Sequence, residues 1–392
     1  MSDPFPQLAN CRVTIVLTSF DLGGAERQAI HLASYLQDVC RAKVAVVGLF
    51  GGLGDQPVRR MCVQRRLSCL RVNMPEHRDG VPTFRSVRQF ARDLAFLQPD
   101  ILLPYTSLPN VLCGIVWQKV GAIACIWNQR DEGRELSINR WHNLALQNAT
   151  HFISNSRDGA AFLTAHRGVP SQKLSLIFNG VELPIPKKTP AEVRHELGIP
   201  NHSFMAVMLA NIHRFKDHTT LVRAWRIVCD RLGEMNPVLV LAGRKDDAAG
   251  IEHLISELGL DRQIKLIGVV ADVSSLLNAA DLAVFSALRE GTPNAVLESM
   301  LAGRAVVATD IQGCRDALGA DYPALTPLQD PNALAEHIVA LARDPGRRME
   351  LGTALSRRAA TEFSVHAMCE QTCRIIERAI HAGSSSTTKF ER

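Results

Sequence analysis

Two glutamates, Glu290 and Glu298, lie eight residues apart in the second half of this 392-residue chain. The sequence Gly291-Thr292-Pro293-Asn294 follows the first of them directly. One apolar run, residues 281–286, precedes this segment, and another, residues 304–309, follows it. The pattern predicts a strand, a loop, a helix that begins near Asn294, and a second strand.

A loop that leads into a helix offers unpaired N–H groups and the positive end of the helix dipole. Such a place suits an anionic or hydroxyl-rich ligand. In a helix over residues 294–301, Glu298 stands about one turn inside, while Glu290 remains in the loop. Two carboxylates at this spacing can hold two different parts of one ligand, which indicates a sugar nucleotide.

The length and composition of the chain indicate how many domains it has and which classes of protein are excluded. A chain of 392 residues exceeds one ordinary core, so we expect two domains. We find no signal peptide at the start and no apolar run of the roughly 18 residues that a membrane span requires. The ten cysteines show no CxxC spacing, and Cys369 and Cys373 lie four apart. We therefore expect reduced thiols rather than a metal site.

The net charge of +5 is distributed unevenly. Between Arg59 and Asp93 there are nine arginines against three acids, Glu76, Asp79 and Asp93. One interpretation is a solvated surface of helices and loops. The other is a patch that meets anionic lipid headgroups or a phosphate-bearing acceptor. Aromatic residues do not alternate with the basic ones, so a nucleic-acid partner is not expected.

Apolar runs alternate with helical patterns along the whole chain, as in parallel, doubly wound sheets. The pattern occurs twice, and the prolines of residues 184–190 indicate the break. We expect two Rossmann-like domains that turn their strand ends toward a central cleft. Expected strands span 13–18, 43–49, 100–104, 122–127, 151–154, 174–178, 204–209, 238–242, 264–269, 282–286 and 305–309. Expected domains are 1–183 and 184–364, with a helix at 365–382 packing back on the first domain and a disordered tail at 383–392.

Two more loops follow strands. Gly23 and Gly24 come after the first strand, without the GxGxxG fingerprint, and let the backbone approach a ligand closely. In the second half, Asn211, Arg214 and Lys216 leave a strand just before a helix that Asp217 is expected to cap. Cations at that place can neutralise a diphosphate.

Together these features resemble GT-B glycosyltransferases of the retaining family GT4, the glycosyl transferases group 1. The resemblance rests on Gly23-Gly24, on Asn179-Gly180-Val181-Glu182, on Lys216-Asp217-His218, and on the segment from Glu290 to Glu298. It covers nearly the whole chain and is stronger in the second half.

The resemblance implies that domain 1–183 binds the acceptor and domain 184–364 the nucleotide sugar, and it implies roles for matching positions. Glu290 corresponds to the residue that contacts the sugar hydroxyls, Glu298 to the one that binds the ribose, and Lys216 to the diphosphate-binding lysine. Gly24 corresponds to the glycine near the phosphates. The remaining donor-binding positions are Gly291, Thr292, Pro293 and Asn294 in the loop, and Val269 and Val270 near the base.

Three departures from the family pattern affect these assignments. Asn211 stands where the family often has an arginine, so Arg214, or less plausibly His213, is the candidate for the second cation. The family's histidine in the first domain is absent, and Arg130 or Asp131 takes its place on the acceptor side. The glycine pair after Thr309-Asp310 reads Gln312-Gly313, a milder change.

The resemblance implies a retaining transfer of a hexose or N-acetylhexosamine from a nucleoside-diphosphate sugar to a glycan or lipid-linked acceptor. The chain has no Asp-x-Asp, so we expect no metal and no cofactor. We expect a cytoplasmic enzyme of polysaccharide or glycolipid synthesis, at the inner face of the membrane if the basic patch binds lipid. A sugar-nucleotide epimerase and a non-catalytic nucleotide-sugar-binding subunit remain as alternatives.

Overall fold

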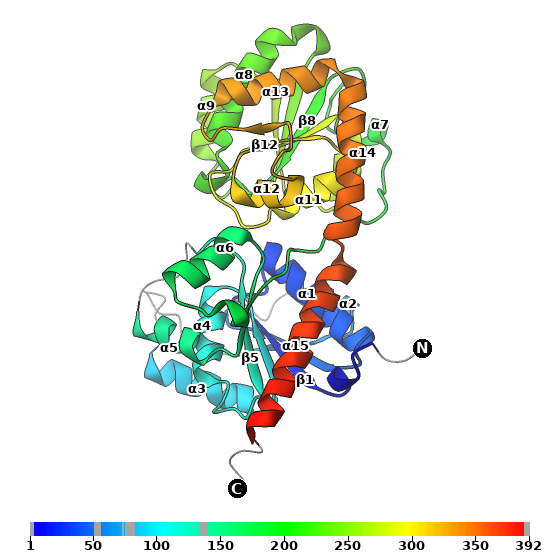
Figure 1. Cartoon of the computed structure of the whole chain (residues 1–392). Coiled ribbons are helices and arrows are strands. Elements are labelled where there is room, and N and C mark those ends of the chain that lie inside the picture. Colours follow the sequence, from blue (N-terminus) through cyan, green and yellow to red (C-terminus); the bar gives the residue numbers. More distant parts are fainter. Residues whose placement is uncertain (1–3, 51–55, 73, 75–82, 134–138, 388–392) are drawn as a thin grey trace. The chain divides into compact units, whose positions relative to one another are not determined.

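The computed structural model describes residues 4–50, 56–72, 74, 83–133 and 139–387. The chain forms two compact units. Unit 1 consists of Met1–Gly180 together with Val365–Arg392, and unit 2 is Val181–Ser364. Each unit contains one sheet whose strands are parallel, so the prediction of two doubly wound α/β domains is confirmed (Figure 1).

Unit 1 has a seven-stranded sheet in the order β3-β2-β1-β4-β5-β6-β7. Its strands are β1 Arg12–Leu17, β2 Lys43–Gly48, β3 Ser68–Arg71, β4 Ile101–Pro104, β5 Ala124–Gln129, β6 His151–Ser154 and β7 Leu174–Leu176. Its helices are α1 Gly24–Asp38, α2 Pro57–Gln64, α3 Phe84–Ala95, α4 Ser107–Val116, α5 Arg140–Asn148, α6 Arg157–Ala161 and α15 Val365–Thr387.

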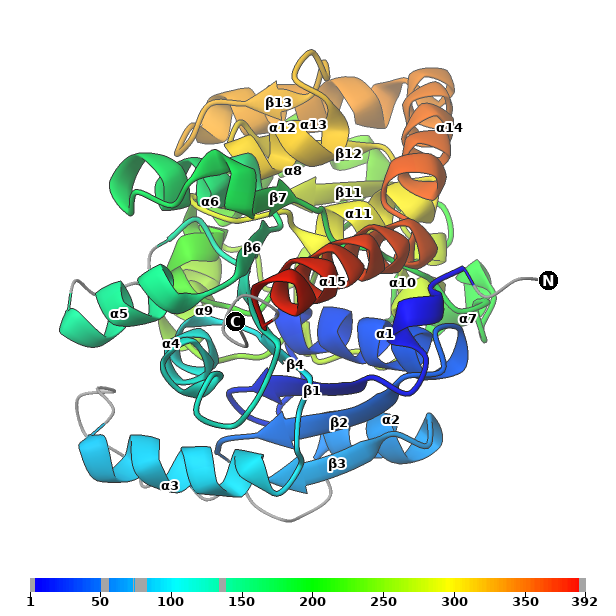
Figure 2. The same cartoon turned by 60° about the horizontal axis from the view of Figure 1, so that its bottom comes forward.

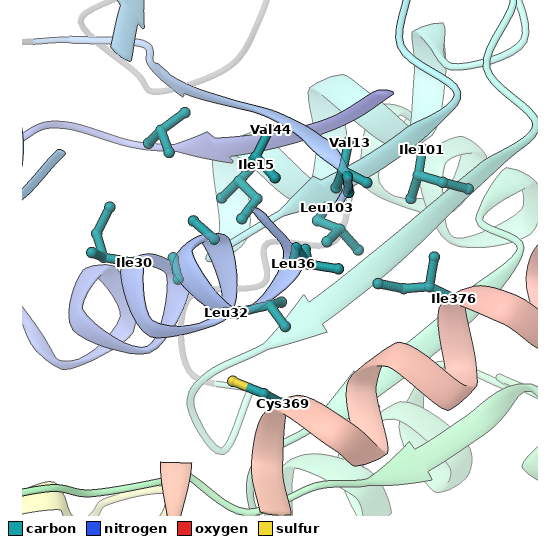
Figure 3. Packing of buried hydrophobic residues seen from close by; sticks show 14 of the residues in the cluster. Val13, Ile15, Ile30, Leu32, Leu36, Val44, Ile101, Leu103, Cys369 and Ile376 are labelled. Carbon is teal, nitrogen blue, oxygen red and sulfur yellow. The ribbon is translucent and has the colours of Figure 1, made fainter. Parts of the chain in front are cut away.

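The sheet of unit 1 is covered on both faces because its strands are apolar on both sides. Val13, Ile15 and Leu17 of β1 pack with α1, α2 and α15, whereas Val16 joins the core formed with α3, α4 and α5. Figure 3 shows Cys369 and Ile376 of α15 facing this first core. Helix α15 lies beside α1 (Figure 2).

Unit 2 has a six-stranded sheet in the order β10-β9-β8-β11-β12-β13. Its strands are β8 Met205–Leu209, β9 Val238–Ala242, β10 Ile264–Gly268, β11 Leu282–Phe285, β12 Val306–Thr309 and β13 Leu325–Thr326. Its helices are α7 Pro190–Glu196, α8 His218–Arg231, α9 Ala249–Glu257, α10 Val273–Ala279, α11 Asn294–Leu301, α12 Gln312–Leu318, α13 Pro331–Arg343 and α14 Pro345–Glu362.

The boundary between the units lies three residues before the predicted boundary, which falls between residues 183 and 184. The chain passes from unit 1 to unit 2 between Gly180 and Val181. Gln28 holds Gly180 through hydrogen bonds with both its N–H and its carbonyl group. The residues after Pro186 belong to unit 2, because the N–H groups of Lys187 and Lys188 donate to side chains at the start of α10.

The predicted disordered tail begins too early. Helix α15 continues to Thr387, so the prediction is wrong for residues 383–387, while residues 388–392 lie outside the described part of the chain. Gly383 and the serines after it are weak helix formers, and a glycine costs about 1 kcal/mol relative to alanine. No proline follows to break the hydrogen-bond ladder, so the helix propagates through them.

Candidate functional site in unit 2

The loop between β8 and α8 has a conformation set by Asp217. This residue is left-handed, with φ 46°, and its carboxylate accepts a hydrogen bond from the N–H of Thr220 at 3.2 Å. The expected cap of α8 is therefore confirmed. Ser286, just after β11, donates to the backbone carbonyls of Lys216 and Asp217 at 3.3 and 3.1 Å. The neighbouring strands β8 and β11 thus hold the loop at the carboxyl edge of the sheet.

Lys216 and Glu290 meet at this edge. Their side chains form an ion pair, and each is about one-fifth exposed, at 23% and 21%. The N–H of Leu288 donates to the carbonyl of Phe215 at 2.9 Å, which joins the two loops through their backbones. The ammonium group also lies 5.1 Å from the centre of the Phe285 ring. A lysine and a glutamate predicted to serve one ligand are thus brought together.

Helix α11 begins at Asn294, as the sequence predicts, with Pro293 in the position before it. Its positive dipole end therefore lies at the same carboxyl edge, where an anion is stabilised. Glu298 is only 6% exposed and Thr292 only 3% exposed. The oxygens of a carboxylate accept several hydrogen bonds, so Glu298 is of a chemical type that can bind the hydroxyl groups of a ligand at this edge.

The other residues of unit 2 that were predicted to bind the nucleotide sugar follow strands β8 and β10, and they differ in exposure and in contacts. The side-chain oxygen of Asn211 accepts from the N–H of Arg244 at 2.9 Å, so it fixes the loop after β9. Arg214 is exposed, and its guanidinium lies 4.6 Å from the Phe215 ring centre. Val269 is 73% exposed, and Val270 follows it after β10.

Gly313, at the start of α12, is a positioning residue, although the sequence indicated it only as the retained glycine of the Gln312-Gly313 pair. A Cβ on Gly313 would lie 1.8 Å from the carbonyl oxygen of Gly291 and 2.8 Å from that of Glu290. Only a residue without a side chain permits this approach. The absence of a Cβ therefore sets where the Glu290 loop runs.

We expect Gly313→Ala to displace the loop of Glu290 and Gly291, because neither carbonyl can coexist with the new methyl group. Overpacking of this kind costs about 1–3 kcal/mol, and donor affinity is expected to fall with it. Urea unfolding and nucleotide titration measure the two effects. Gly250→Ala is the matched control, because its Cβ has nothing within 4 Å. Wild-type stability and affinity in Gly313→Ala would show that the loop tolerates the contact.

His218 follows the same loop and was not singled out as a site residue. It is 2% exposed, and within the described residues neither ring nitrogen has a hydrogen-bond partner. Burial, together with the charge of Lys216, lowers the pKa of His218 to about 4. An unfolded histidine has a pKa near 6.5. The unfolded state thus binds this proton more readily, and stability present above pH 6.5 is lost as the pH falls toward 4.

His218→Gln is expected to flatten the acid dependence of unfolding, since the titrating group is removed. The wild-type slope from His218 approaches 1.4 kcal/mol per pH unit at most, or about one bound proton. Urea unfolding between pH 7 and pH 4, followed by a signal from unit 2, measures this slope. His213→Gln removes an exposed histidine of the same loop and serves as the control. An unchanged slope in His218→Gln would contradict the assignment.

The predicted residues of unit 1 occupy the carboxyl edge of its own sheet. Gly24 opens α1 after β1. The carboxylate of Asp131 accepts from the side chain of Gln129 and from the N–H of Gly133, both at 2.6 Å. Asp131 therefore stabilises its own turn. The guanidinium of Arg130 lies over the Tyr105 ring at 4.5 Å.

Groups of three or more metal-ligating side chains are absent from the residues that the structure describes. The described cysteines are free thiols, and the sulfurs of Cys40 and Cys373 lie 3.6 Å apart in the core of unit 1. Of the basic segment, Arg85, Arg88 and Arg92 are exposed on α3. Glu76, Arg78 and Asp79 lie outside the described residues.

Comparison with known proteins gives two family matches. Residues 22–184 match the model described as Glycosyltransferase Family 4, and residues 203–344 match the one described as Glycosyl transferases group 1. Among solved structures, Anabaena Alr3699/HepE in complex with UDP and glucose is similar, with a TM-score of 0.79 and 20% identity. That match covers 94% of this chain and 100% of the other.

Three curated relatives share 24–28% identity with parts of the chain. The putative glycosyltransferase EpsD of Bacillus subtilis is 28% identical over 173 residues, 44% of this chain and 45% of the relative. D-inositol 3-phosphate glycosyltransferase of Corynebacterium glutamicum is 24% identical over 246 residues, which are 60% of this chain and 59% of the relative. N,N'-diacetylbacillosaminyl-diphospho-undecaprenol alpha-1,3-N-acetylgalactosaminyltransferase of Campylobacter jejuni is 27% identical over 145 residues, which are 36% of this chain and 37% of the relative. The matched part of the chain thus spans 37–59% of the length of these relatives.

Proposed function

Because the chain belongs to glycosyltransferase family 4, the glycosyl transferases group 1, and has the GT-B fold, we propose that it transfers a sugar from a nucleoside-diphosphate donor. The donor sugar is a hexose or an N-acetylhexosamine, and the acceptor is a glycan or a lipid-linked sugar. The product belongs to polysaccharide, lipopolysaccharide or glycolipid synthesis.

The observation that carries this proposal is the pairing of Lys216 with Glu290 beside the first turn of α11. In an open α/β sheet, ligands bind outside the carboxyl ends of the strands, where this pair lies. The cation suits a diphosphate, and the carboxylates of Glu290 and Glu298 suit the hydroxyl pairs of the sugar and the ribose. The backbone N–H groups of Gly291, Thr292 and Asn294, which lie between Glu290 and Glu298 in the sequence, can donate to the sugar and the diphosphate.

We infer the following reaction at this site. The bond between the sugar's anomeric carbon and the diphosphate breaks, and a bond from the acceptor's hydroxyl oxygen forms on the same face of the sugar. The departing phosphate takes the acceptor's proton, so the configuration is retained and no separate base is required. Lys216, with Arg214 as the second cation, stabilises the charge that develops on the leaving diphosphate. Glu290 positions the sugar.

We propose that this reaction needs no metal ion, because Lys216 and the end of α11 already supply positive charge and the sequence has no Asp-x-Asp. Transfer is therefore expected to continue at an unchanged rate after treatment with EDTA, measured as release of nucleoside diphosphate. An activity that EDTA abolishes and Mg²⁺ or Mn²⁺ restores would contradict this.

Two of the relatives are named for phosphorylated molecules, D-inositol 3-phosphate and a diphospho-undecaprenol-linked sugar. We propose a phosphate-bearing acceptor for this chain as well, bound on unit 1. No described helix is long and apolar enough to cross a bilayer. We further infer peripheral contact with the inner face of the membrane through Arg85, Arg88 and Arg92 of α3, near exposed Phe84 and Phe96.

Thermal stabilisation by a panel of nucleotide sugars, including UDP-hexoses, UDP-N-acetylhexosamines and GDP-mannose, tests donor recognition. The stabilising donor is then incubated with acceptors, and NMR of the product reads the anomeric configuration. Acceptor-dependent release of nucleoside diphosphate supports a transferase. Tight donor binding without turnover would instead identify a non-catalytic binding subunit, and conversion of the donor to its epimer would identify an epimerase.

A further inference from the structure

Arg130 stands at the carboxyl end of β5 and is held by neutral groups. Its Nη2 donates to the side-chain oxygen of Asn128 at 3.0 Å, and its Nη1 donates to that of Asn179 at 3.3 Å. The guanidinium carbon lies 4.5 Å from the centre of the Tyr105 ring. All three partners are at most 5% exposed. The guanidinium is therefore fixed in place rather than free to move in solvent.

The described side chains of unit 1 provide no counter-charge for this guanidinium. Within the described residues Arg130 makes no ion pair, and its buried Nε has no hydrogen-bond acceptor. The carboxylate of the adjacent Asp131 accepts from Gln129 and Gly133. Burial raises the pKa of Tyr105, so the phenol stays neutral. A partly buried cation without a counter-charge is costly, unless an anion completes the site.

The surroundings of Arg130 are those of a ligand site. The order β3-β2-β1-β4-β5 places the reversal of strand order between β1 and β4, the usual place for ligands in such sheets. At that point Thr106 has φ 71° and ψ 176°, a region that costs a non-glycine residue about 1–3 kcal/mol. Its hydroxyl lies 2.8 Å from that of Thr18, and the preceding Tyr105 pairs with Asn128. Strained and polar groups thus converge beside the guanidinium.

We propose that Arg130 binds a phosphoryl group of the acceptor at the carboxyl edge of the sheet in unit 1. This inference rests on the proposed transferase function and its phosphate-bearing acceptor, and it adds the residue that recognises the phosphate and the place in the fold where it binds. The fork of N–H donors on a guanidinium matches phosphate oxygens, and charge-assisted hydrogen bonds of this kind are strong. Asn128, Asn179 and Tyr105 position the guanidinium without competing as anions.

The test measures binding of geranyl diphosphate and of glucose 1-phosphate to the full chain by calorimetry. The donor site is first saturated with UDP, GDP or ADP, whichever stabilises the protein, so that only other phosphate sites respond. Geraniol controls for the apolar tail. Arg130→Gln is compared with Arg130→Lys and with Arg140→Gln, which removes an exposed guanidinium stacked on Trp141 at 5.1 Å. Circular dichroism and nucleotide affinity show that each variant is folded.

We expect Arg130→Gln to weaken phosphate-ligand binding at least about tenfold, the loss of one charge-assisted contact. Arg130→Lys should keep part of the affinity, and Arg140→Gln should keep all of it. Binding of geranyl diphosphate alone identifies a lipid-linked diphosphate, and binding of both ligands identifies a phosphate ester of either kind. Wild-type affinity in Arg130→Gln, equal binding of geraniol, or no phosphate binding beside a saturated donor site overturns the inference. Failure of every nucleotide to bind would instead overturn the proposed function.

Discussion

Replacing Lys216 with alanine is expected to lower kcat by about two to three orders of magnitude, with a smaller change in KM. The ammonium group is placed to stabilise charge that grows on the diphosphate as the sugar leaves, and losing one such contact costs about 3–4 kcal/mol. Steady-state kinetics with the donor identified by the screen measure both constants. The effect should exceed simple loss of an ion pair, because exposed pairs contribute at most about 1 kcal/mol.

Lys188→Ala provides the matched control for this result. Lys188 also pairs with a glutamate, Glu196, but both side chains are about half exposed, and the pair lies at α7 rather than at the carboxyl edge. We expect wild-type kinetics from it. If Lys216→Ala turns over donor as fast as the wild type, or as fast as Lys188→Ala, the diphosphate role of Lys216 is wrong.

The second large effect is expected from Glu298→Ala, and it should appear in donor affinity. A buried carboxylate that accepts hydrogen bonds from ribose hydroxyls contributes about 1.5–3 kcal/mol, which corresponds to about 10- to 150-fold in Kd. Titration of the nucleoside diphosphate measures it without any need for turnover. Since the ribose contact is made before and during reaction, KM should rise while kcat changes little.

Glu257→Ala is the control for Glu298, since Glu257 is an exposed glutamate at the far end of α9. It should bind donor like the wild type. Glu298→Gln separates charge from shape, and we expect its affinity to fall between those of the alanine variant and the wild type. Unchanged affinity in Glu298→Ala would remove Glu298 from the donor site.

The buried strands could be predicted from the sequence because their short, continuous apolar runs indicate strands that are buried on both faces. Strands β6 and β9 match their predicted bounds, and α11 matches the predicted helix. Strand β3 escaped prediction because Ser68–Arg71 is a largely exposed edge strand, and β13 because it has only two residues. The predicted unit boundary, between residues 183 and 184, lies three residues after the observed one, where Gly180 is held by Gln28, a side chain 152 residues away.

The site was only partly predictable, because its contacts also join residues that are far apart in the sequence. The sequence identifies Lys216 and Glu290 as separate loop residues 74 positions apart. Their ion pair depends on β8 and β11 lying side by side, which is a property of the sheet order. The close contact of Gly313 with the carbonyl of Gly291 likewise joins two loops that only the fold brings together. Asp131 remains a predicted acceptor-side residue, and the structure adds that its carboxylate accepts a hydrogen bond within its own turn.

Hydrogen exchange with and without nucleotide sugar tests the central claim most directly, namely that the donor lies at the carboxyl edge of the sheet in unit 2. With the stabilising donor bound, peptides that contain residues 211–218 and 288–301 should exchange more slowly, because their backbone groups contact the ligand or carry its side-chain contacts. Protection at these two loops, lost in Glu298→Ala, is the predicted result. Donor binding that leaves both loops unprotected, or that protects only segments of unit 1, would contradict the account.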